Sequence, residues 1–166
     1  FLDPKKDMQT FSPKKSVRDV LSIIDAQLKS NNIIYSIESE ENILVRGVEN
    51  EFKQVLLVLF NNSKDAVKEL LHKKIIEQGI LDISLKVIKN WVIIEVKDNA
   101  GGINPEIMKD IFSPYFTTKA ENNGTGIGLY IAKNIIETRM EGSISVANRD
   151  KGSCFTITLK LDRENV

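Results

Sequence analysis

The spacing of hydrophobic residues predicts the helices of this chain. Between residues 16 and 30, apolar side chains recur at the period of one helix face, and Ser16 is a candidate N-cap. A longer amphipathic helix is predicted over residues 50–72. Pro105 marks the start of a short helix, and a further helix is predicted over residues 125–139, beginning inside a glycine-rich segment.

Short β-rich runs bounded by turn residues predict strands between and after these helices, over residues 33–37, 43–45, 80–88, 91–97, 142–147 and 153–161. The first two runs are interpreted as a hairpin or as two adjacent strands. The third and fourth are predicted to be antiparallel strands joined by a tight turn. This order of elements predicts an α/β (α+β) two-layer sandwich, with a mixed sheet of about five strands covered on one face by about three helices.

The chain length suits one compact domain. Residues 1–15, with Pro4, Pro13 and several lysines, are predicted to be an extended lead-in. Residues 16–166 carry the periodic segments and are predicted to form the globular domain. The first residues lack a hydrophobic signal core and are typical of the middle of a longer protein.

The composition narrows the possible partners. Lys plus Arg and Asp plus Glu both number 23, so the net charge does not indicate a nucleic acid, an anionic membrane surface or an acidic substrate. The single cysteine, Cys154, cannot form an internal disulfide, and no apolar run reaches the roughly 18 residues that span a bilayer. We therefore expect a cytoplasmic location and no nucleic-acid partner.

The first candidate site residue, Asn62, lies in the long predicted helix. Helical spacing places its amide beside Leu59 and Ala66, at the border of the buried stripe, where its carbonyl oxygen could ligate a hard cation. The simpler interpretation is that Asn61 and Asn62 are surface positions of an amphipathic helix. This segment alone leaves both interpretations open.

The second candidate segment is Asp-Asn-Ala-Gly-Gly at residues 98–102, where a predicted strand ends. Two successive glycines allow a tight turn and a close approach of the backbone to a flat ligand. Asp98 would then face a pocket, where a carboxylate can accept a hydrogen bond from an exocyclic amine such as that of adenine. Taken alone, the segment could also be an ordinary turn.

The third candidate segment, Gly-Thr-Gly-Ile-Gly-Leu at residues 124–129, leads into the amino end of a predicted helix. Such helix ends bind phosphate groups. The spacing matches neither the Walker pattern nor a dinucleotide fingerprint. In isolation, the segment could be a flexible connection before an amphipathic helix.

An aromatic-rich segment, residues 111–119, lies between the two glycine clusters. It is predicted to form an anchored lid, whose aromatic side chains pack on the core while Thr118 and Lys119 approach phosphate oxygens. The aromatic side chains could equally do no more than fill the core.

The four segments together occur in the order and approximate spacing that resembles the ATP-binding domain of sensor histidine kinases. The equivalents in that family are an asparagine box (Asn62), a first glycine box (98–102), a phenylalanine box (112–119) and a second glycine box (124–129). The segment Gly-Ser-Cys-Phe at residues 152–155 resembles the closing strand motif. The resemblance covers nearly the whole chain.

This resemblance implies a Bergerat-type α/β sandwich that uses ATP and Mg²⁺. Asn62 would hold Mg²⁺, Asp98 would bind the adenine amine, and the lid would close over the triphosphate. The nucleotide-binding residues implied in this way are Asn62, Asp65, Asp98, Gly102, Ile103, Phe116, Thr118, Lys119, Gly124, Thr125, Gly126, Ile127, Gly128 and Leu129.

The resemblance also implies the partners. The γ-phosphoryl group would pass to a histidine on a dimerisation domain outside this chain, and then to an aspartate of a response regulator. His72, the only histidine, is followed by lysines, whereas the family's phosphoacceptor histidine resembles His followed by Glu or Asp. The full-length protein would be a homodimer through the helices of that dimerisation domain, and the present chain mainly a monomer.

Three positions depart from the family pattern. Asp65 stands where some members carry a lysine or arginine, with Lys64 adjacent, so the side chain that approaches the phosphates there is open. Ala100 replaces a glycine, which is tolerable if its φ is not positive. Val58 stands where many kinases have a second asparagine.

Two alternative functions remain, and position 58 bears on the first, an ATPase or serine kinase. Related ATPases and anti-sigma serine kinases resemble one another in having a glutamate there, and valine cannot act as a base. A histidine imidazole is already a nucleophile, so phosphorylation of a histidine depends less on a base at this position. The other alternative is a regulatory module that binds nucleotide without transferring a phosphoryl group, against which the intact glycine boxes argue.

Overall fold

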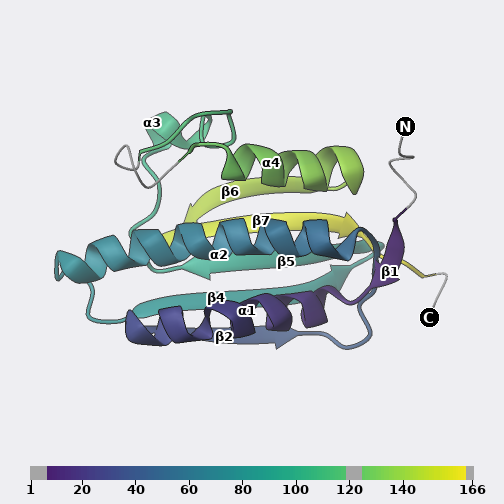
Figure 1. The fold of residues 1–166 in the computed structure, drawn as a ribbon, viewed down its shortest axis with the longest axis horizontal. Coiled ribbons are helices and arrows are strands. Elements are labelled where there is room, and N and C mark those ends of the chain that lie inside the picture. The colour runs from purple at the N-terminus through teal and green to yellow at the C-terminus, as the bar shows by residue number, and fades with distance from the viewer. Residues whose placement is uncertain (1–6, 119–124, 164–166) are drawn as a thin grey trace.

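The computed structural model describes residues 7–118 and 125–163. The elements in these ranges are β1 (Gln9–Phe11), α1 (Pro13–Ser30), β2 (Ile33–Ser39), β3 (Val45–Gly47), α2 (Glu49–His72), β4 (Gly79–Ile88), β5 (Trp91–Asp98), α3 (Pro105–Met108), α4 (Gly128–Asn134), a π-helical turn (Ile135–Arg139), β6 (Ser143–Arg149) and β7 (Gly152–Lys160). Figure 1 shows these elements along the chain.

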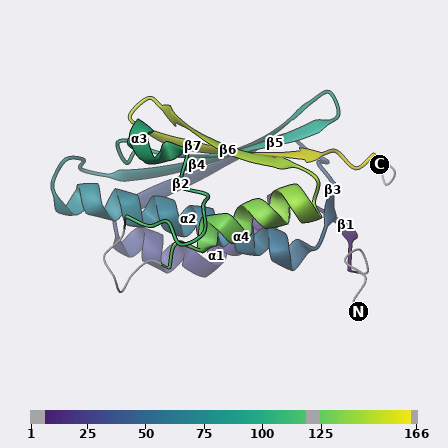
Figure 2. The same cartoon turned by 90° about the horizontal axis from the view of Figure 1, so that it is seen from above.

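The main sheet is mixed. In the described part of the chain it has five strands in the order β2-β4-β5-β7-β6, with β2 parallel to β4 and the other pairs antiparallel. Helices α1, α2 and α4 lie side by side on one face of it (Figures 1 and 2). The predicted two-layer sandwich is therefore confirmed.

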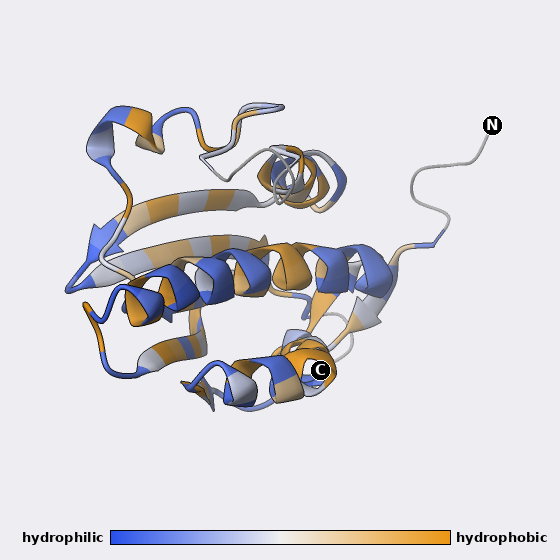
Figure 3. Ribbon diagram, turned by 60° about the vertical axis from the view of Figure 1, so that its left-hand side comes forward, coloured by the Kyte–Doolittle hydropathy of each residue, from blue (hydrophilic) through white to orange (hydrophobic). Residues whose placement is uncertain are grey.

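Helix α2 forms the centre of the helical layer. Phe52, Leu56 and Leu59 recur at helical spacing and are fully buried against the sheet, and burying each such side chain contributes about 1.5–3 kcal/mol. Hydrophobic and hydrophilic residues alternate along this helix (Figure 3). Ala66 is exposed, so the apolar stripe continues through Ser63 and Val67 rather than through Ala66 as predicted.

The first helix begins three residues earlier than predicted. Ser12, not Ser16, is the N-cap: its hydroxyl accepts a hydrogen bond from the backbone N–H of Lys15 at 3.2 Å, and Pro13 follows at the first helical position. Ser16 is buried inside the helix. Because β1 precedes this helix and buries Phe11, part of the predicted lead-in packs with the domain.

The prediction that residues 33–37 and 43–45 form a hairpin or adjacent strands is wrong. Strand β2 pairs with β4, whereas β3 pairs with β1 in a separate two-stranded ribbon. The β4–β5 hairpin and the strands β6 and β7 are confirmed. No helix in residues 7–118 or 125–163 is long and apolar enough to cross a membrane.

Candidate nucleotide-binding site

Asp98 ends strand β5 as a buried carboxylate surrounded by donors. It is 5% exposed. The hydroxyls of Ser63 and Ser153 both donate to its Oδ2 at 3.0 Å. The backbone N–H groups of Ala100 and Ser153 donate to its Oδ1 at 3.0 and 3.2 Å. These four donors hold the carboxylate in one orientation, with its charge stabilised by hydrogen bonds.

The bond from Ser63 joins two predicted motifs. Ser63 follows Asn62 on α2 and is 2% exposed, so the asparagine segment and the end of β5 meet inside the protein although they are far apart in sequence. Asn62 and Asp65 are half-buried on the same helix. Asn62 therefore lies beside the buried stripe, as helical spacing predicted.

The neighbouring Lys64 points away from these motifs. Its ammonium group donates to Oε1 of Gln27 on α1 at 2.6 Å, and α1 and α4 lie on opposite sides of α2 (Figure 1). This contact directs the Lys64 side chain toward α1, so Asp65 is the stronger candidate site residue at this turn of the helix.

The first glycine cluster is an irregular segment after β5, held by the turn between β6 and β7. Gly101 and Gly102 have φ of +82° and +85°, a region that favours glycine. The N–H of Gly101 donates to the carbonyl of Lys151 at 2.7 Å. Ala100 is not in the left-handed region, so the condition for replacing the family's glycine there is met.

Ile103 is fixed by a residue that the sequence did not indicate. The side chain of Asn148 on β6 accepts a hydrogen bond from the N–H of Ile103 and donates one to its carbonyl, each at 2.8 Å. A Cβ on Gly102 would lie 2.8 Å from Oδ1 of Asn148. Asn148 and the two serines that donate to Asp98 thus make polar contacts in the site that the sequence motifs did not indicate.

Gly152 allows β7 to approach the end of β5. A Cβ at this position would lie 1.7 Å from the backbone oxygen of Asp98, a separation that no side chain can occupy. The adjacent Ser153 is thereby brought to the carboxylate. Position 153 lies in the segment predicted to be the closing strand motif, but its hydroxyl could not be assigned a role from sequence.

The aromatic segment packs on the core through its phenylalanines, as both interpretations predicted, whereas Tyr115 is exposed. Phe112 and Phe116 are half-buried against core residues. The Phe112 ring makes an edge contact with Phe155, with ring centroids 6.1 Å apart, and the Lys133 ammonium lies 5.5 Å from the Phe112 centroid. Thr118 is exposed, and Lys119 lies outside the described residues.

The second glycine cluster meets both the aromatic segment and α2. Gly126 has φ of +69°, and a Cβ there would lie 2.4 Å from the carbonyl carbon of Tyr115. A Cβ on Gly128 would lie 3.3 Å from Val58 of α2. The segment around Gly126 and Gly128 therefore lies against the middle of the aromatic segment and against the helix that carries Asn62.

Helix α4 begins at Gly128, not at Thr125 as predicted. Before it, the Thr125 hydroxyl accepts a hydrogen bond from the N–H of Ile127 at 3.4 Å. Leu129 packs partly buried against the core. Gly124 lies outside the described residues, so the prediction for that position stays untested.

The polar groups fit Mg²⁺ held through a nucleotide. The carbonyl oxygen of the Asn62 amide is a suitable hard ligand. In the described ranges there is no group of three or more His, Cys, Asp or Glu side chains that could hold a metal by themselves. Mg²⁺ usually keeps several waters and binds phosphates through few protein ligands, so one amide oxygen suits Mg-nucleotide better than a free metal.

Comparison with known families decides the relationship. Residues 47–163 match the family described as histidine kinase-, DNA gyrase B- and HSP90-like ATPase, which is more than half of the chain. The chain belongs to this ATPase family. Val58, Asn62, Asp98 and Gly126 all lie inside the matched residues of the family.

Individual relatives within the family are bacterial sensor kinases. The chain is 31% identical to the two-component sensor PprA of Pseudomonas aeruginosa over 91% of this chain and 16% of that protein. It is 33% identical to the sensor histidine kinase ZraS of Salmonella typhimurium over 92% of this chain and 31% of that protein. The chain thus spans less than a third of the length of either relative.

Solved structures share the fold. The catalytic domain of histidine kinase ThkA superposes with a TM-score of 0.81 at 29% identity, covering 92% of this chain and 95% of that one. ThkA in complex with the response regulator protein TrrA superposes with a TM-score of 0.77 at 26% identity, covering 96% of this chain and 43% of that one. These matches confirm the fold expected for a histidine kinase ATP-binding domain.

Proposed function

We propose that this chain binds Mg-ATP and transfers the γ-phosphoryl group to a histidine on a separate dimerisation domain. The observation that best supports the proposal is the hydrogen bond from Ser63 to Asp98, because it joins the asparagine segment to the expected adenine carboxylate. The close approach of Gly126 to Tyr115 and Phe116 also supports it, because it brings the second glycine box, the expected phosphate-binding segment, next to the predicted lid. Family membership makes ATP the expected nucleotide.

Each group has a distinct task in this proposal. Asp98 accepts a hydrogen bond from the adenine amine, since a carboxylate is an acceptor only. The segment at Gly101 and Gly102 admits the flat base, with Ile103 as an apolar contact. Asn62 holds Mg²⁺, and Asp65 lies one helical turn further on. When bound, Mg²⁺ neutralises phosphate charge in the transferring group.

The phosphate side is assigned to the lid and the second glycine box. Phe116 anchors the lid on the core, and Thr118 and Lys119 are proposed to approach the phosphates. Residues 124–129 would present backbone N–H groups, which bind anions well at the start of a helix. Catalysis would consist of positioning and charge stabilisation, so no side chain of this chain is proposed to form a covalent intermediate.

The proposed partners follow from the relatives. The sensor kinases that it resembles are much longer than this chain, and ThkA has been solved with a response regulator. We propose that the phosphohistidine formed on the dimerisation domain passes its phosphoryl group to a response regulator in the cytoplasm. The full-length protein would be a homodimer, and this chain alone a monomer.

Calorimetric titration tests nucleotide binding directly. Mg-ATP, Mg-ADP and, as a matched ligand, Mg-GTP are titrated into the wild type, Asp98→Asn and Asn62→Ala, with folding checked by circular dichroism. We expect adenine nucleotides to bind and GTP not to bind. Asp98→Asn should weaken both adenine nucleotides, whereas Asn62→Ala should weaken binding mainly when Mg²⁺ is present. Equal binding of GTP and ATP would contradict the assignment of Asp98.

Phosphoryl transfer needs a second experiment. The chain is mixed with labelled Mg-ATP and a histidine-bearing helical hairpin domain from a related kinase, and the product is tested for acid-labile phosphate. Formation of phosphohistidine supports the kinase. Nucleotide binding without any transfer would favour a regulatory module, and release of free phosphate without the hairpin would favour an ATPase, for which Val58 offers no base.

A further inference from the structure

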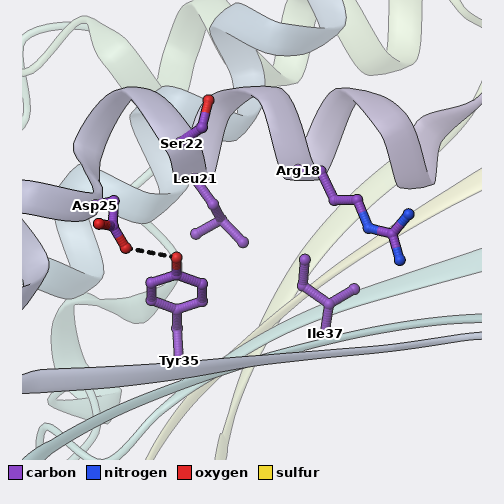
Figure 4. Close-up of a pocket in the computed structure, with 6 residues that line it drawn as sticks. All are labelled: Arg18, Leu21, Ser22, Asp25, Tyr35 and Ile37. Carbon is purple, nitrogen blue, oxygen red and sulfur yellow. Dashed lines mark hydrogen bonds between the residues drawn. The ribbon is translucent and has the colours of Figure 1, made fainter.

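A hollow lies between α1 and β2, away from the nucleotide site. Its volume is about 380 Å³, and Arg18, Leu21, Ser22, Asp25, Tyr35 and Ile37 line it. Figure 4 shows Arg18 and Ile37 at one end and Asp25 and Tyr35 at the other, with Leu21 between them. The lining residues come from α1 and from β2, which is the edge strand of the five-stranded sheet in the described part of the chain, so the hollow is a groove between a helix and the edge of the sheet.

β2 has no partner strand on that side in the described part of the chain. The N–H of Gly79 donates to the carbonyl of Asn32, and the N–H of Glu40 donates to the carbonyl of Leu85. In a parallel ladder, alternate residues direct both backbone groups to the same neighbour. These two bonds therefore assign the even-numbered residues of β2 to β4 and direct the N–H and C=O groups of Tyr35 and Ile37 outward.

The same two residues direct their side chains toward α1. Tyr35 and Ile37 are half-buried, whereas the alternate residues Ile34, Ser36 and Glu38 are exposed. A strand added at this edge would pair with the backbone of Tyr35 and Ile37. Because side chains of paired residues share a face, every second side chain of the added strand would enter the groove under α1.

The polar groups of the groove define its chemistry. The Tyr35 hydroxyl donates to Oδ1 of Asp25 at 2.6 Å, and Lys29 pairs with Oδ2 of Asp25 at 2.9 Å. The polar groups at that end are therefore already paired with one another. The wall between the two ends, formed by Leu21 and the Tyr35 ring, is apolar.

At the other end of the groove, no hydrogen bond or ion pair connects the Arg18 guanidinium to a residue in the described ranges. The Glu41 carboxylate near it pairs with Lys14 at 2.8 Å, and Lys14 first, then the charge of Arg18, lower the pKa of Glu41. The Arg18 cation at the rim can therefore still pair with an incoming carboxylate.

We propose that the groove between α1 and β2 binds an extended segment of a partner protein by strand addition. The segment carries an aliphatic side chain over Leu21 and Tyr35, and an aspartate or glutamate two positions away that pairs with Arg18. Backbone hydrogen bonds at Tyr35 and Ile37 supply affinity, and the groove supplies specificity, as in other helix-and-edge-strand peptide sites. The proposal does not depend on nucleotide binding.

Selection from a displayed library of random short peptides tests this site. The wild-type protein is the selection target, and peptides that also bind the Ser22→Trp variant are discarded. An indole at this exposed position would fill the mouth of the groove. Ile23→Trp is the matched control, since Ile23 is exposed on the same helix but does not line the groove. Thermal unfolding and ADP titration verify that both variants fold and keep the nucleotide site.

We expect enriched peptides with an aliphatic residue and an acidic residue two positions apart. Ser22→Trp should weaken their binding at least about tenfold, as for loss of a central anchor, and Ile23→Trp should leave it unchanged. Arg18→Glu should weaken acidic peptides by about fivefold, the scale of an exposed ion pair, and should reverse the preference when the peptide acid is replaced by lysine. Amide NMR shifts should concentrate at Tyr35 and Ile37.

Three outcomes would overturn the proposal. The first is the absence of peptides that distinguish wild type from Ser22→Trp. The second is a set of peptides whose NMR shifts lie outside α1 and β2. The third is concentration-dependent dimerisation of the wild type that Ser22→Trp abolishes, because the edge would then pair with a second copy of this chain rather than with another protein.

Discussion

The Asp98 network allows one prediction with a magnitude. Ser63→Ala removes one of two hydroxyls that donate to the same carboxylate oxygen, in a place where donor and acceptor are almost fully buried. A hydrogen bond to a charged group contributes about 1.5–3 kcal/mol. Since the Ser153 hydroxyl remains, we expect a loss of unfolding free energy near the lower limit, about 1.5 kcal/mol.

The double variant should lose more than the sum of the single variants. Ser153→Ala should cost about the same as Ser63→Ala, since both bonds are 3.0 Å long. Removing both hydroxyls leaves Oδ2 of Asp98 buried without either donor, and neighbours that share a network show coupling of about 0.5–3 kcal/mol. We expect a coupling of about 1 kcal/mol in the destabilising direction.

Urea unfolding followed by far-ultraviolet circular dichroism measures these differences. Ser145→Ala, at an exposed position of β6, is the matched control and should stay within about 0.5 kcal/mol of wild type. ADP affinity is measured in parallel, and we expect it to fall in both single variants because Asp98 loses orientation. Single variants as stable as Ser145→Ala would refute the reasoning.

Three shorter predictions follow from other contacts. Gly152→Ala should lower the free energy of unfolding by more than about 3 kcal/mol, because its Cβ would meet fixed backbone atoms. Gly47→Ala is the matched variant and should cost less than about 1.5 kcal/mol, because its Cβ would meet only the flexible side chain of Met140. Thermal unfolding compares the two variants. Phe112→Ala should cost about 2 kcal/mol, since the ring is half-buried, and should speed amide exchange in the lid. The hydrogen bond from Tyr35 and then Lys29 lower the pKa of Asp25 below its ordinary 3.8, so the stability difference between wild type and Tyr35→Phe should be complete above that pH and disappear as pH falls below it. Equal differences at acid and neutral pH in urea titrations would contradict this last prediction.

Local patterns predicted the elements better than their pairing. The apolar period of α2 and the turn between β4 and β5 are short-range signals, and both elements were predicted closely. Strand β2 was predicted to form a hairpin with the next strand or to lie beside it, because a polar segment and a second β-rich run follow it. Its partner β4 lies beyond α2, and no local pattern carries that pairing. The start of α1 was available from sequence, since Ser12 followed by Pro13 is an N-cap signature.

The site was predicted in its motifs but not in its supporting contacts. Asp98 and Asn62 stand out because glycines or helical spacing surround them. Ser63 and Ser153 are common residues whose importance comes from converging on one carboxylate across the fold. Asn148 could not be identified from the sequence for the same reason, because its hydrogen bonds to Ile103 join segments far apart in the chain. The π-helical turn after α4, with the N–H of Met140 donating to the carbonyl of Ile135, likewise has no sequence signal that we recognise.

The four donors around Asp98 also limit how this domain can change during evolution. In a descendant that no longer needed nucleotide, replacing the aspartate by a residue without an acceptor would leave two hydroxyls and the Ser153 backbone N–H buried without their partner. We expect substitutions at position 98 to occur together with substitutions at positions 63 and 153. Loss of the lid or of Asn62 would meet no such obstacle, so inactive descendants should keep the aspartate longest.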